Sequence, residues 1–293
     1  MVLTMIKRIL CRKYIILIAI IIFLVFFLYF ENNNIIVSKY NIKSSTLPKA
    51  FDNFKIVQIS DLHNKVFYKD NNTLTDKIKS QNPDIIVITG DLVDRRKYNE
   101  ENALSFIDKI KSIAPIYYVN GNHEGWSGKF ASLEKKLKEK GVFVLRNESI
   151  DCEKDGEKII ISGVDDPAFN TSGSSENYMN EDIMKSELLR VNNKKYFKIL
   201  LSHRPEFFNL YVNNNIDVVF TGHAHGGQII IPFIGGILSP NQGFWPKYYK
   251  GIHRKNNTNT TMVISRGLGN STFPQRIFNR PEIVIVTLKV AKN

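Results

Sequence analysis

The sequence predicts an α/β protein, with helices layered on buried sheets, preceded by one N-terminal transmembrane helix. Two observations predict this class. From residue 54 onward, short apolar runs typical of buried strands alternate with segments of helical periodicity. Near the N-terminus, residues 14–30 form an uncharged stretch long enough to cross a bilayer. A third observation concerns function: polar residues, including most of the histidines, gather where the predicted strands end.

The composition of the 293-residue chain is that of a globular protein. Hydrophobic residues make up 43% and charged residues 23%, so disorder is not its main state. Only two cysteines occur, Cys11 and Cys152, which excludes a disulfide framework and a cysteine-built zinc site. The formal net charge of +12 suits an anionic membrane or a phosphate-rich ligand, or simply reflects scattered surface lysines. No nucleic-acid partner is expected, because no long basic run occurs.

The N-terminal apolar stretch is interpreted as a signal anchor that contacts the lipid bilayer. As a helix, residues 14–30 (YIILIAIIIFLVFFLYF) would span about 25 Å, enough for a bilayer core. Four bases lie before the run in segment 1–13 and Glu31 follows it, so segment 1–13 is predicted to be cytoplasmic and the catalytic domain extracytoplasmic. A cleaved signal peptide would need small residues where bulky ones end the run. A buried core helix is disfavoured because the run is apolar on all faces.

The rest of the chain is predicted to be a linker over residues 31–53, which could hold one strand, and one domain over residues 54–293. Strands are expected at 54–59, 84–89, 116–119, 143–145, 159–162, 198–202, 217–221, 262–265 and 283–288. Helices are expected at 72–80, 101–111, 130–139 and 180–191. Segment 231–251 is expected to be a long loop that forms a lid or acyl-chain groove, dips into the membrane interface, or covers the sandwich edge.

Polar clusters follow five of the expected strands. They are Asp61–His63, Asp91–Asp94, Asn120–Glu124, His203–Arg204 and His223–His225, and they contain five of the six histidines. Strand ends of an open α/β sheet form the ligand crevice, so we expect these clusters to converge. Imidazole and carboxylate ligands without thiolate suit Mn, Fe, Zn or Co. One ion needs fewer ligands, so a shared carboxylate could bridge two ions about 3.5–4 Å apart, as in phosphoryl-transfer centres.

These motifs resemble a known superfamily. DLH at Asp61, GDLVD at Asp91, GNHE at Asn122, SH at His203 and GHAH at His223 resemble the calcineurin-like metallophosphoesterases over about residues 54–230. The later motif SRGLGNS at Ser265 is similar to the membrane-associated bacterial branch grouped with UDP-2,3-diacylglucosamine hydrolase-like phosphoesterases. The resemblance implies a four-layer α/β/β/α metallophosphatase sandwich with two divalent metal ions at one edge.

The resemblance also implies the roles of individual residues. Asp61, His63 and His225 would hold one metal, Asn122, His203 and His223 the other, and Asp91 would bridge both. A hydroxide between the ions would be the nucleophile. His123 would stabilise phosphate charge and protonate the leaving oxygen, and Asp94 would orient its ring. Arg95 stands where the superfamily's phosphoprotein phosphatases have a phosphate-binding arginine, but Arg96 replaces the glycine of their GDxVDRG motif. A surface role is the alternative for Arg95.

The sequence thus predicts a membrane-anchored dimetal phosphoesterase and leaves its substrate open. A phosphodiester, a sugar-nucleotide pyrophosphate or a lipid-linked phosphate would fit. An exported domain favours an envelope phosphodiester or phospholipid over cytoplasmic UDP-sugars, and fold alone does not decide the matter. A relaxed phosphomonoesterase is the alternative among enzymes. A non-catalytic metal- or phosphate-binding module at the membrane is the alternative of another class.

Overall fold

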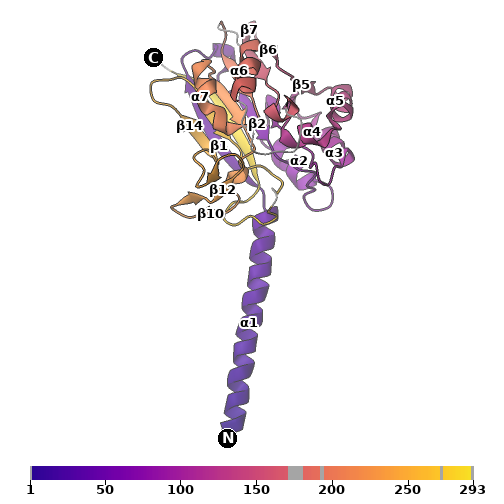
Figure 1. Ribbon diagram of the computed structural model, residues 1–293, viewed down its shortest axis with the longest axis vertical. Coiled ribbons are helices and arrows are strands. Elements are labelled where there is room, and N and C mark those ends of the chain that lie inside the picture. The colour runs from indigo at the N-terminus through magenta and orange to yellow at the C-terminus, as the bar shows by residue number, and fades with distance from the viewer. Residues whose placement is uncertain (1, 171–180, 192–194, 271–272, 292–293) are drawn as a thin grey trace.

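The computed structural model describes residues 2–170, 181–191, 195–270 and 273–291. Helix α1 (Val2–Asn33) projects from a body that holds all the other elements (Figure 1). Within α1, Leu10–Asn33 is long and apolar enough to cross a membrane, and only 6% of its most apolar window is buried. A helix that is apolar all round has no face suited to water. The helix is therefore consistent with the expected single transmembrane segment.

The body is built on two six-stranded sheets. Sheet A has the strand order β1 (Ile36–Ser44), β16 (Glu282–Val290), β2 (Lys55–Ile59), β3 (Ile85–Thr89), β4 (Ile116–Val119) and β5 (Phe143–Val144). Strands β2 to β5 run parallel, whereas β16 runs antiparallel to β2 and parallel to β1. The parallel strands are continuous apolar runs, because helices and the second sheet cover both faces of sheet A.

Sheet B repeats this plan with different edges. Its order is β14 (Gly251–Arg254), β15 (Thr261–Ile264), β9 (Val218–Thr221), β8 (Lys198–Leu201), β7 (Glu157–Gly163) and β6 (Glu148–Lys154). The four central strands are parallel, and antiparallel strands close both edges. As in sheet A, the parallel strands therefore end at one common edge.

Helices cover the outer face of each sheet, so the body has four layers (Figure 1). Sheet A carries α2 (Asn72–Lys79), α3 (Glu100–Ile110), α4 (Asn122–Ser127) and α5 (Phe130–Glu139), and sheet B carries α6 (Glu181–Arg190) and α7 (Phe208–Asn213). Single 3₁₀ turns lie at Lys49–Phe51, Pro167–Asn170, Pro205–Phe207 and His225–Gly227. One apolar core lies between the sheets, and one lies under each helical layer. The expected α/β/β/α sandwich is confirmed.

Two regions are more regular than their expected outlines. Segment 31–53, expected as a linker that could hold one strand, contributes one strand, β1, which pairs with β16 over nine residues at the edge of sheet A. Segment 231–251, expected as a loop, folds into two small hairpins, β10 (Ile230–Ile231) with β11 (Gly235–Gly236), and β12 (Leu238–Ser239) with β13 (Gly243–Phe244). Residue 180 of the fourth expected helix and residue 271 of SRGLGNS lie outside the described residues.

Candidate metal centre

Five parallel strands end at one edge of the sandwich, and polar side chains follow each of them. Asp61 and His63 follow β2, Asp91 and Asp94 follow β3, Asn122 and His123 begin α4 directly after β4, His203 follows β8, and His223 and His225 follow β9. Strands β2, β3 and β4 are neighbours in sheet A, and β8 and β9 are neighbours in sheet B. The two packed sheets therefore bring both sets of strand ends to the same crevice.

Sharp turns direct these side chains inward. The backbone angle φ lies between 48° and 63° at Asp61, His63, Asp91, His223 and His225. Residues other than glycine seldom adopt this left-handed conformation, and such outliers gather at functional sites. Backbone hydrogen bonds between neighbouring turns hold the conformation, including Asp61 N to Gly90 O at 3.0 Å and His63 N to Asp91 O at 2.9 Å. The sandwich thus stabilises a local geometry that the chain alone would not favour.

One buried cluster, called site 1, joins Asp61, His63, Asp91 and His225. Nε2 of His225 lies 3.2 Å from Nε2 of His63 and 3.4 Å from Oδ1 of Asp61. Nε2 of His63 lies 3.6 Å from Oδ2 of Asp91. These side chains come from the ends of β2, β3 and β9, so both sheets contribute to site 1.

A second buried cluster, called site 2, surrounds His203. Its Nε2 lies 3.3 Å from Oδ2 of Asp91, 3.1 Å from Oδ1 of Asn122 and 3.2 Å from Nδ1 of His223. Oδ2 of Asp91 therefore belongs to both clusters. The structure brings together every metal ligand that the resemblance implied.

The donor atoms of both sites fit divalent metal ions. The atoms that face one another are of the types that bind metals: carboxylate oxygens, an amide oxygen and imidazole nitrogens. Ligands held about 2.0–2.2 Å from one ion lie about 3–3.6 Å from each other, and the contacts of 3.1–3.6 Å given above match that spacing. Groups of this kind repel one another unless a cation lies between them. The buried Asp/His cluster can therefore bind metal ions.

Outer contacts orient the imidazoles of site 2. Nδ1 of His203 donates to the carbonyl oxygen of Thr89 at 2.8 Å, which leaves Nε2 free to bind a metal. Nε2 of His223 lies 2.8 Å from Oδ1 of Asn241 and 3.0 Å from Nη1 of Arg204, so Nδ1 is the nitrogen that faces the centre. Burial first, and then the charge of Arg204, hold the pKa of His223 well below its usual range.

The electrostatics of the metal-free centre favour neutral His63 and His225 beside an ionised Asp91 and a protonated His203. Burial lowers the pKa of His63 to about 3 and holds that of His225 well below its ordinary value. Burial would raise the pKa of Asp91, but neighbouring imidazoles, His203 foremost, hold it well below the usual range. Burial would lower the pKa of His203, yet Asp91 and Asp61 raise it to about 10. This excess of carboxylate charge is what a bound cation would neutralise.

Two features shape the loop that carries Asp91. The fully buried carboxylate of Glu124 accepts hydrogen bonds from the backbone N–H groups of Asp91, Leu92 and Gly121 at 2.9, 2.7 and 2.8 Å. Gly121 packs so closely that a Cβ there would lie 2.3 Å from Oδ1 of Asp91. Likewise, a Cβ on Gly222 would lie 1.9 Å from Oγ of Ser60. These glycines are required by close packing around the ligands.

His123 lies beside site 1 rather than within either cluster of ligands. Its ring centroid is 4.4 Å from that of His63. Nδ1 of His123 accepts the backbone N–H of Arg95 at 3.2 Å, which places the proton of the neutral ring on Nε2. The nearest oxygen of Asp94 is 3.8 Å from Nδ1, beyond hydrogen-bond distance. Burial would raise the pKa of Asp94, but hydrogen bonds from Arg96 lower it.

The arginines near the centre are held in different ways. The guanidinium of Arg95 stacks on Trp126, with its carbon 4.4 Å from the ring centroid, and this places Arg95 near His123. Arg204 is buried, and its Nε donates to Asp166 at 2.6 Å. Its Nη1 reaches Oδ1 of Asn241 at 2.5 Å, so Arg204 acts on site 2 through Asn241 and His223.

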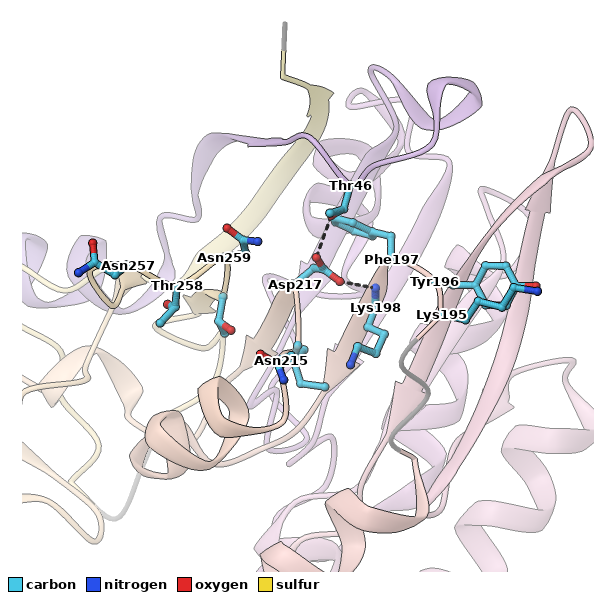
Figure 2. Close-up of a pocket in the computed structure, with 12 residues that line it drawn as sticks. Thr46, Lys195, Tyr196, Phe197, Lys198, Asn215, Asp217, Asn257, Thr258 and Asn259 are labelled. Carbon is cyan, nitrogen blue, oxygen red and sulfur yellow. Dashed lines mark hydrogen bonds between the residues drawn. The ribbon is translucent and has the colours of Figure 1, made fainter. Parts of the chain in front are cut away.

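A cavity of about 500 Å³ lies at the opposite end of sheet B, where β8, β9 and β15 begin (Figure 2). Its central carboxylate, Asp217, accepts hydrogen bonds from Thr46 Oγ1 at 3.0 Å and from the backbone N–H of Lys198 at 2.8 Å. This cavity contains none of the predicted site residues. The chain itself satisfies the carboxylate of Asp217, which gives this residue a structural role.

Sequence reasoning missed three residues that shape the centre. Thr89 and Asn241 orient the imidazoles of site 2, and Glu124 holds the loop of Asp91. Glu124 directly follows His123, so its position in the GNHE motif was a usable signal. Thr89 acts through its backbone carbonyl, and Asn241 comes from the small hairpins, so no side-chain pattern could reveal them.

A sandwich of this kind, with a buried Asp/His cluster at its edge, defines a metal-dependent phosphoesterase. The chain belongs to the calcineurin-like phosphoesterase family, whose model matches residues 54–227. The uncharacterized metallophosphoesterase YkuE of Bacillus subtilis is 32% identical and aligns with 88% of this chain and 87% of its own length. An uncharacterized metallophosphoesterase of Aquifex aeolicus is 30% identical over 86% of this chain and 91% of its own. A transmembrane protein with metallophosphoesterase domain from Bos taurus is 26% identical over 84% of this chain and 55% of its own.

Proposed function

We propose that the protein is a membrane-anchored dimetal phosphoesterase that hydrolyses a phosphodiester, a pyrophosphate or a lipid-linked phosphate. One observation carries the proposal: two buried clusters of ligand atoms share Oδ2 of Asp91. A carboxylate shared in this way suits two ions placed to act on one phosphoryl group. The family supports phosphoester chemistry, whereas the choice among these substrates is ours.

In this proposal the chain supplies two sets of ligands. Asp61, His63 and His225 hold one ion, Asn122, His203 and His223 hold the other, and Asp91 holds both. Bound divalent ions would supply charge neutralisation for the phosphoryl oxygens and a water acidic enough to attack at neutral pH. Thr89 holds His203 through Nδ1, and Asn241 holds His223 through Nε2, so the opposite ring nitrogens would face the metals. The buried walls exclude bulk water and so strengthen these interactions.

His123 is proposed to assist the leaving group. With Nδ1 turned toward the backbone of Arg95, the N–H at Nε2 of the neutral ring can donate a hydrogen bond to a phosphoryl oxygen. Transfer of a proton to the leaving oxygen would come from the imidazolium form, whose single positive charge the carboxylate of Asp94, 3.8 Å from Nδ1, would stabilise. Arg95 stacks on Trp126 beside this histidine and is proposed to bind an outer phosphate oxygen.

The anchor is proposed to cross the membrane once, with segment 1–13 in the cytoplasm and the body outside. Bases before the apolar helix and an acid after it support this orientation. The test is labelling of intact cells with a membrane-impermeant maleimide, in a background where both native cysteines are serine. Lys135→Cys on the exposed surface of α5 should react, and Lys13→Cys should react only after lysis. The reverse pattern would overturn the orientation.

The catalytic proposal is tested with the full-length chain in detergent, loaded with Mn. Hydrolysis of bis(4-nitrophenyl) phosphate is compared with that of 4-nitrophenyl phosphate, before and after chelation. Metal-dependent cleavage of the diester is expected. Cleavage of the monoester alone would favour a relaxed phosphomonoesterase. Two bound metals with no turnover of either compound, of a pyrophosphate diester or of phospholipids would indicate a binding module instead.

A further inference from the structure

The body exposes large apolar side chains at the end from which α1 leaves. Six of them, called the rim, are Phe233, Ile234, Phe244, Trp245, Phe273 and Phe278. Figure 1 shows β10 and β12, whose hairpins carry the first four, beside the point where α1 joins the body. Phe233 is fully exposed, and Trp245 is 57% exposed. Large exposed apolar patches on a folded body mark interaction surfaces.

Backbone hydrogen bonds join the segments of the rim into one surface. Ile230 N donates to Ile277 O at 3.0 Å, which ties the first hairpin to the segment carrying Phe273 and Phe278. Ile237 N donates to Ile229 O at 2.9 Å, and Trp245 N donates to Ile237 O at 2.9 Å, which ties the second hairpin to the first. The rim is therefore a continuous surface of the fold rather than a set of separate loop tips.

Contacts with α1 place the rim at the level of the apolar helix. The ring of Phe278 packs against Phe27 of α1, with centroids 5.7 Å apart. Nε2 of Gln275 donates to the carbonyl oxygen of Leu28 at 3.1 Å. Phe27 lies six residues before the end of the helix, or about 9 Å along its axis at 1.5 Å per residue. The segment around Phe278 therefore lies alongside the last turns of α1, within the part of the helix that is apolar enough to span a membrane.

The charge around the rim is positive. Between Phe233 and Phe278 the chain has no aspartate or glutamate. Lys247 and Lys250 follow the second hairpin directly. The guanidinium of Arg280 lies over Phe30 of α1, 5.3 Å from the ring centroid. Exposed aromatic residues with flanking bases are typical of surfaces that enter the interface of a membrane with anionic lipids.

The rim is also connected to the metal centre. Nδ2 of Asn279 donates to the carbonyl oxygen of His225 at 2.7 Å. The backbone N–H of the same Asn279 donates to the buried carboxylate of Glu31, in the last turn of α1, at 3.1 Å. Asn279 therefore connects the last turn of α1 to His225, a ligand of site 1. The metal centre lies at the membrane-facing end of the body.

From these contacts we infer that the rim inserts into the interface of an anionic phospholipid bilayer next to α1 and holds the metal centre at the level of the lipid head groups. The substrate class that fits this placement is a phosphoester carried by a membrane lipid. The inference rests on the proposed phosphoesterase function and anchoring, and adds a second contact with the bilayer beyond the helix. Trp and Phe side chains favour the interfacial depth at which the rim would lie.

The two tryptophans of the chain allow a direct test. The full-length protein is reconstituted in vesicles of phosphatidylcholine and phosphatidylglycerol whose acyl chains are brominated near the head group. The Trp126→Phe variant reports on Trp245 alone, and the Trp245→Phe variant reports on Trp126, on α4 farther from α1 (Figure 1). Brominated lipid should quench Trp245 more strongly than Trp126. Equal emission of Trp245 with and without bromine would overturn the inference.

A second pair of variants guards against quenching caused by the helix alone. In the Trp126→Phe background, Phe233→Ser with Phe244→Ser should reduce the quenching of Trp245. Phe143→Ser, at an exposed phenylalanine on the far edge strand β5, should leave it unchanged. Unreduced quenching in the rim variant would contradict insertion of the rim. Cross-linked dimers without quenching would assign the rim to a second copy of the chain and also overturn the inference.

The same samples separate this inference from the proposals it rests on. Flotation of the vesicles tests anchoring, and turnover of bis(4-nitrophenyl) phosphate by the chain with both tryptophans, in the same vesicles, tests the phosphoesterase. A chain that floats and hydrolyses the diester while Trp245 remains unquenched would refute the rim alone. A chain that does not float would refute the anchor and the rim together. Quenching of Trp245 without hydrolysis would support the rim and contradict the proposed catalysis.

Discussion

The two ends of the parallel strands treat carboxylates in different ways. At the amino ends of β8 and β9, the half-buried Asp217 accepts hydrogen bonds from a hydroxyl and a backbone N–H (Figure 2). At the carboxyl ends, Oδ1 of the buried Asp91 accepts the backbone N–H of His123, whereas its Oδ2 faces imidazole nitrogens of His63 and His203. The chain therefore satisfies Asp217, whereas Oδ2 of Asp91 lies among other groups that bind metals. A buried acid in the second setting indicates a cation, and that contrast distinguishes the functional edge from the structural one.

The largest expected effect comes from replacing each of these two carboxylates in turn by the neutral amide of asparagine. Asp91→Asn should lower turnover to the background rate, because changes even to outer partners of metal ligands cost about 10–100-fold in affinity or activity. Asp217→Asn removes the same charge from the other end of the sheet and should leave turnover and metal content unchanged. Steady-state kinetics and metal analysis of both variants check this. Equal losses would remove the distinction between the two edges.

The next effect concerns histidines inside and outside the centre. His123→Ala should reduce turnover by about 10²–10⁴-fold, the contribution usual for a positioned proton donor, while metal content persists. The matched control is His253→Ala, because His253 lies on β14, where its Nε2 contacts Lys250 O. The ratio of turnover to bound metal measures the effect. Unchanged turnover in His123→Ala would exclude it as the proton donor.

The third effect separates loop support from chemistry. Glu124→Gln should lower the free energy of unfolding by about 1–3 kcal/mol, since one amide N–H would face backbone donors that now bind a carboxylate oxygen. Exposed Glu101→Gln on α3 is the control and should change stability little. Chemical denaturation of both variants gives the difference. Equal stabilities would show that Glu124 does not hold the loop of Asp91.

The smallest effect is a pH dependence of the metal-free protein. The pKa of His203 is raised to about 10, above the ordinary value of about 6.5. Its stabilising contribution is therefore complete below about pH 6.5 and is lost as the pH rises through about 10. Melting temperatures of the chelated chain should fall across this window. The Mn-loaded chain should show a smaller fall, because the metal replaces the proton. Parallel curves would contradict the assigned role of His203.

Most of the sandwich could be predicted because its parallel strands are short apolar runs with clear ends. The runs at 84–89 and 116–119 correspond to β3 and β4 within one residue. Strand β6 escaped prediction, and β1 was expected only as one unplaced strand within residues 31–53, because both are half-exposed edge strands with mixed polar residues. Helix α4 was hidden because it begins within the GNHE motif and is only six residues long.

The candidate ligands could be predicted because each follows a strand within a few residues of its end. Their convergence depends on sheet packing, which the sequence indicated only through the alternation of elements. The contact from Glu31 through Asn279 to His225 could not be predicted, since it joins residues nearly 250 positions apart. Glu31, the acidic residue after the apolar run, could not be distinguished from an ordinary flanking charge until its burial was known.

The central claim is that Asp91 lies between two metal ions at the carboxyl edge of the sandwich. Crystals of the full-length chain grown with Mn and measured at the Mn absorption edge test it most directly. The account predicts two anomalous peaks about 3.5–4 Å apart, one beside His63 and His225 and the other beside His203 and His223. A single peak, or peaks away from Asp91, would contradict the account.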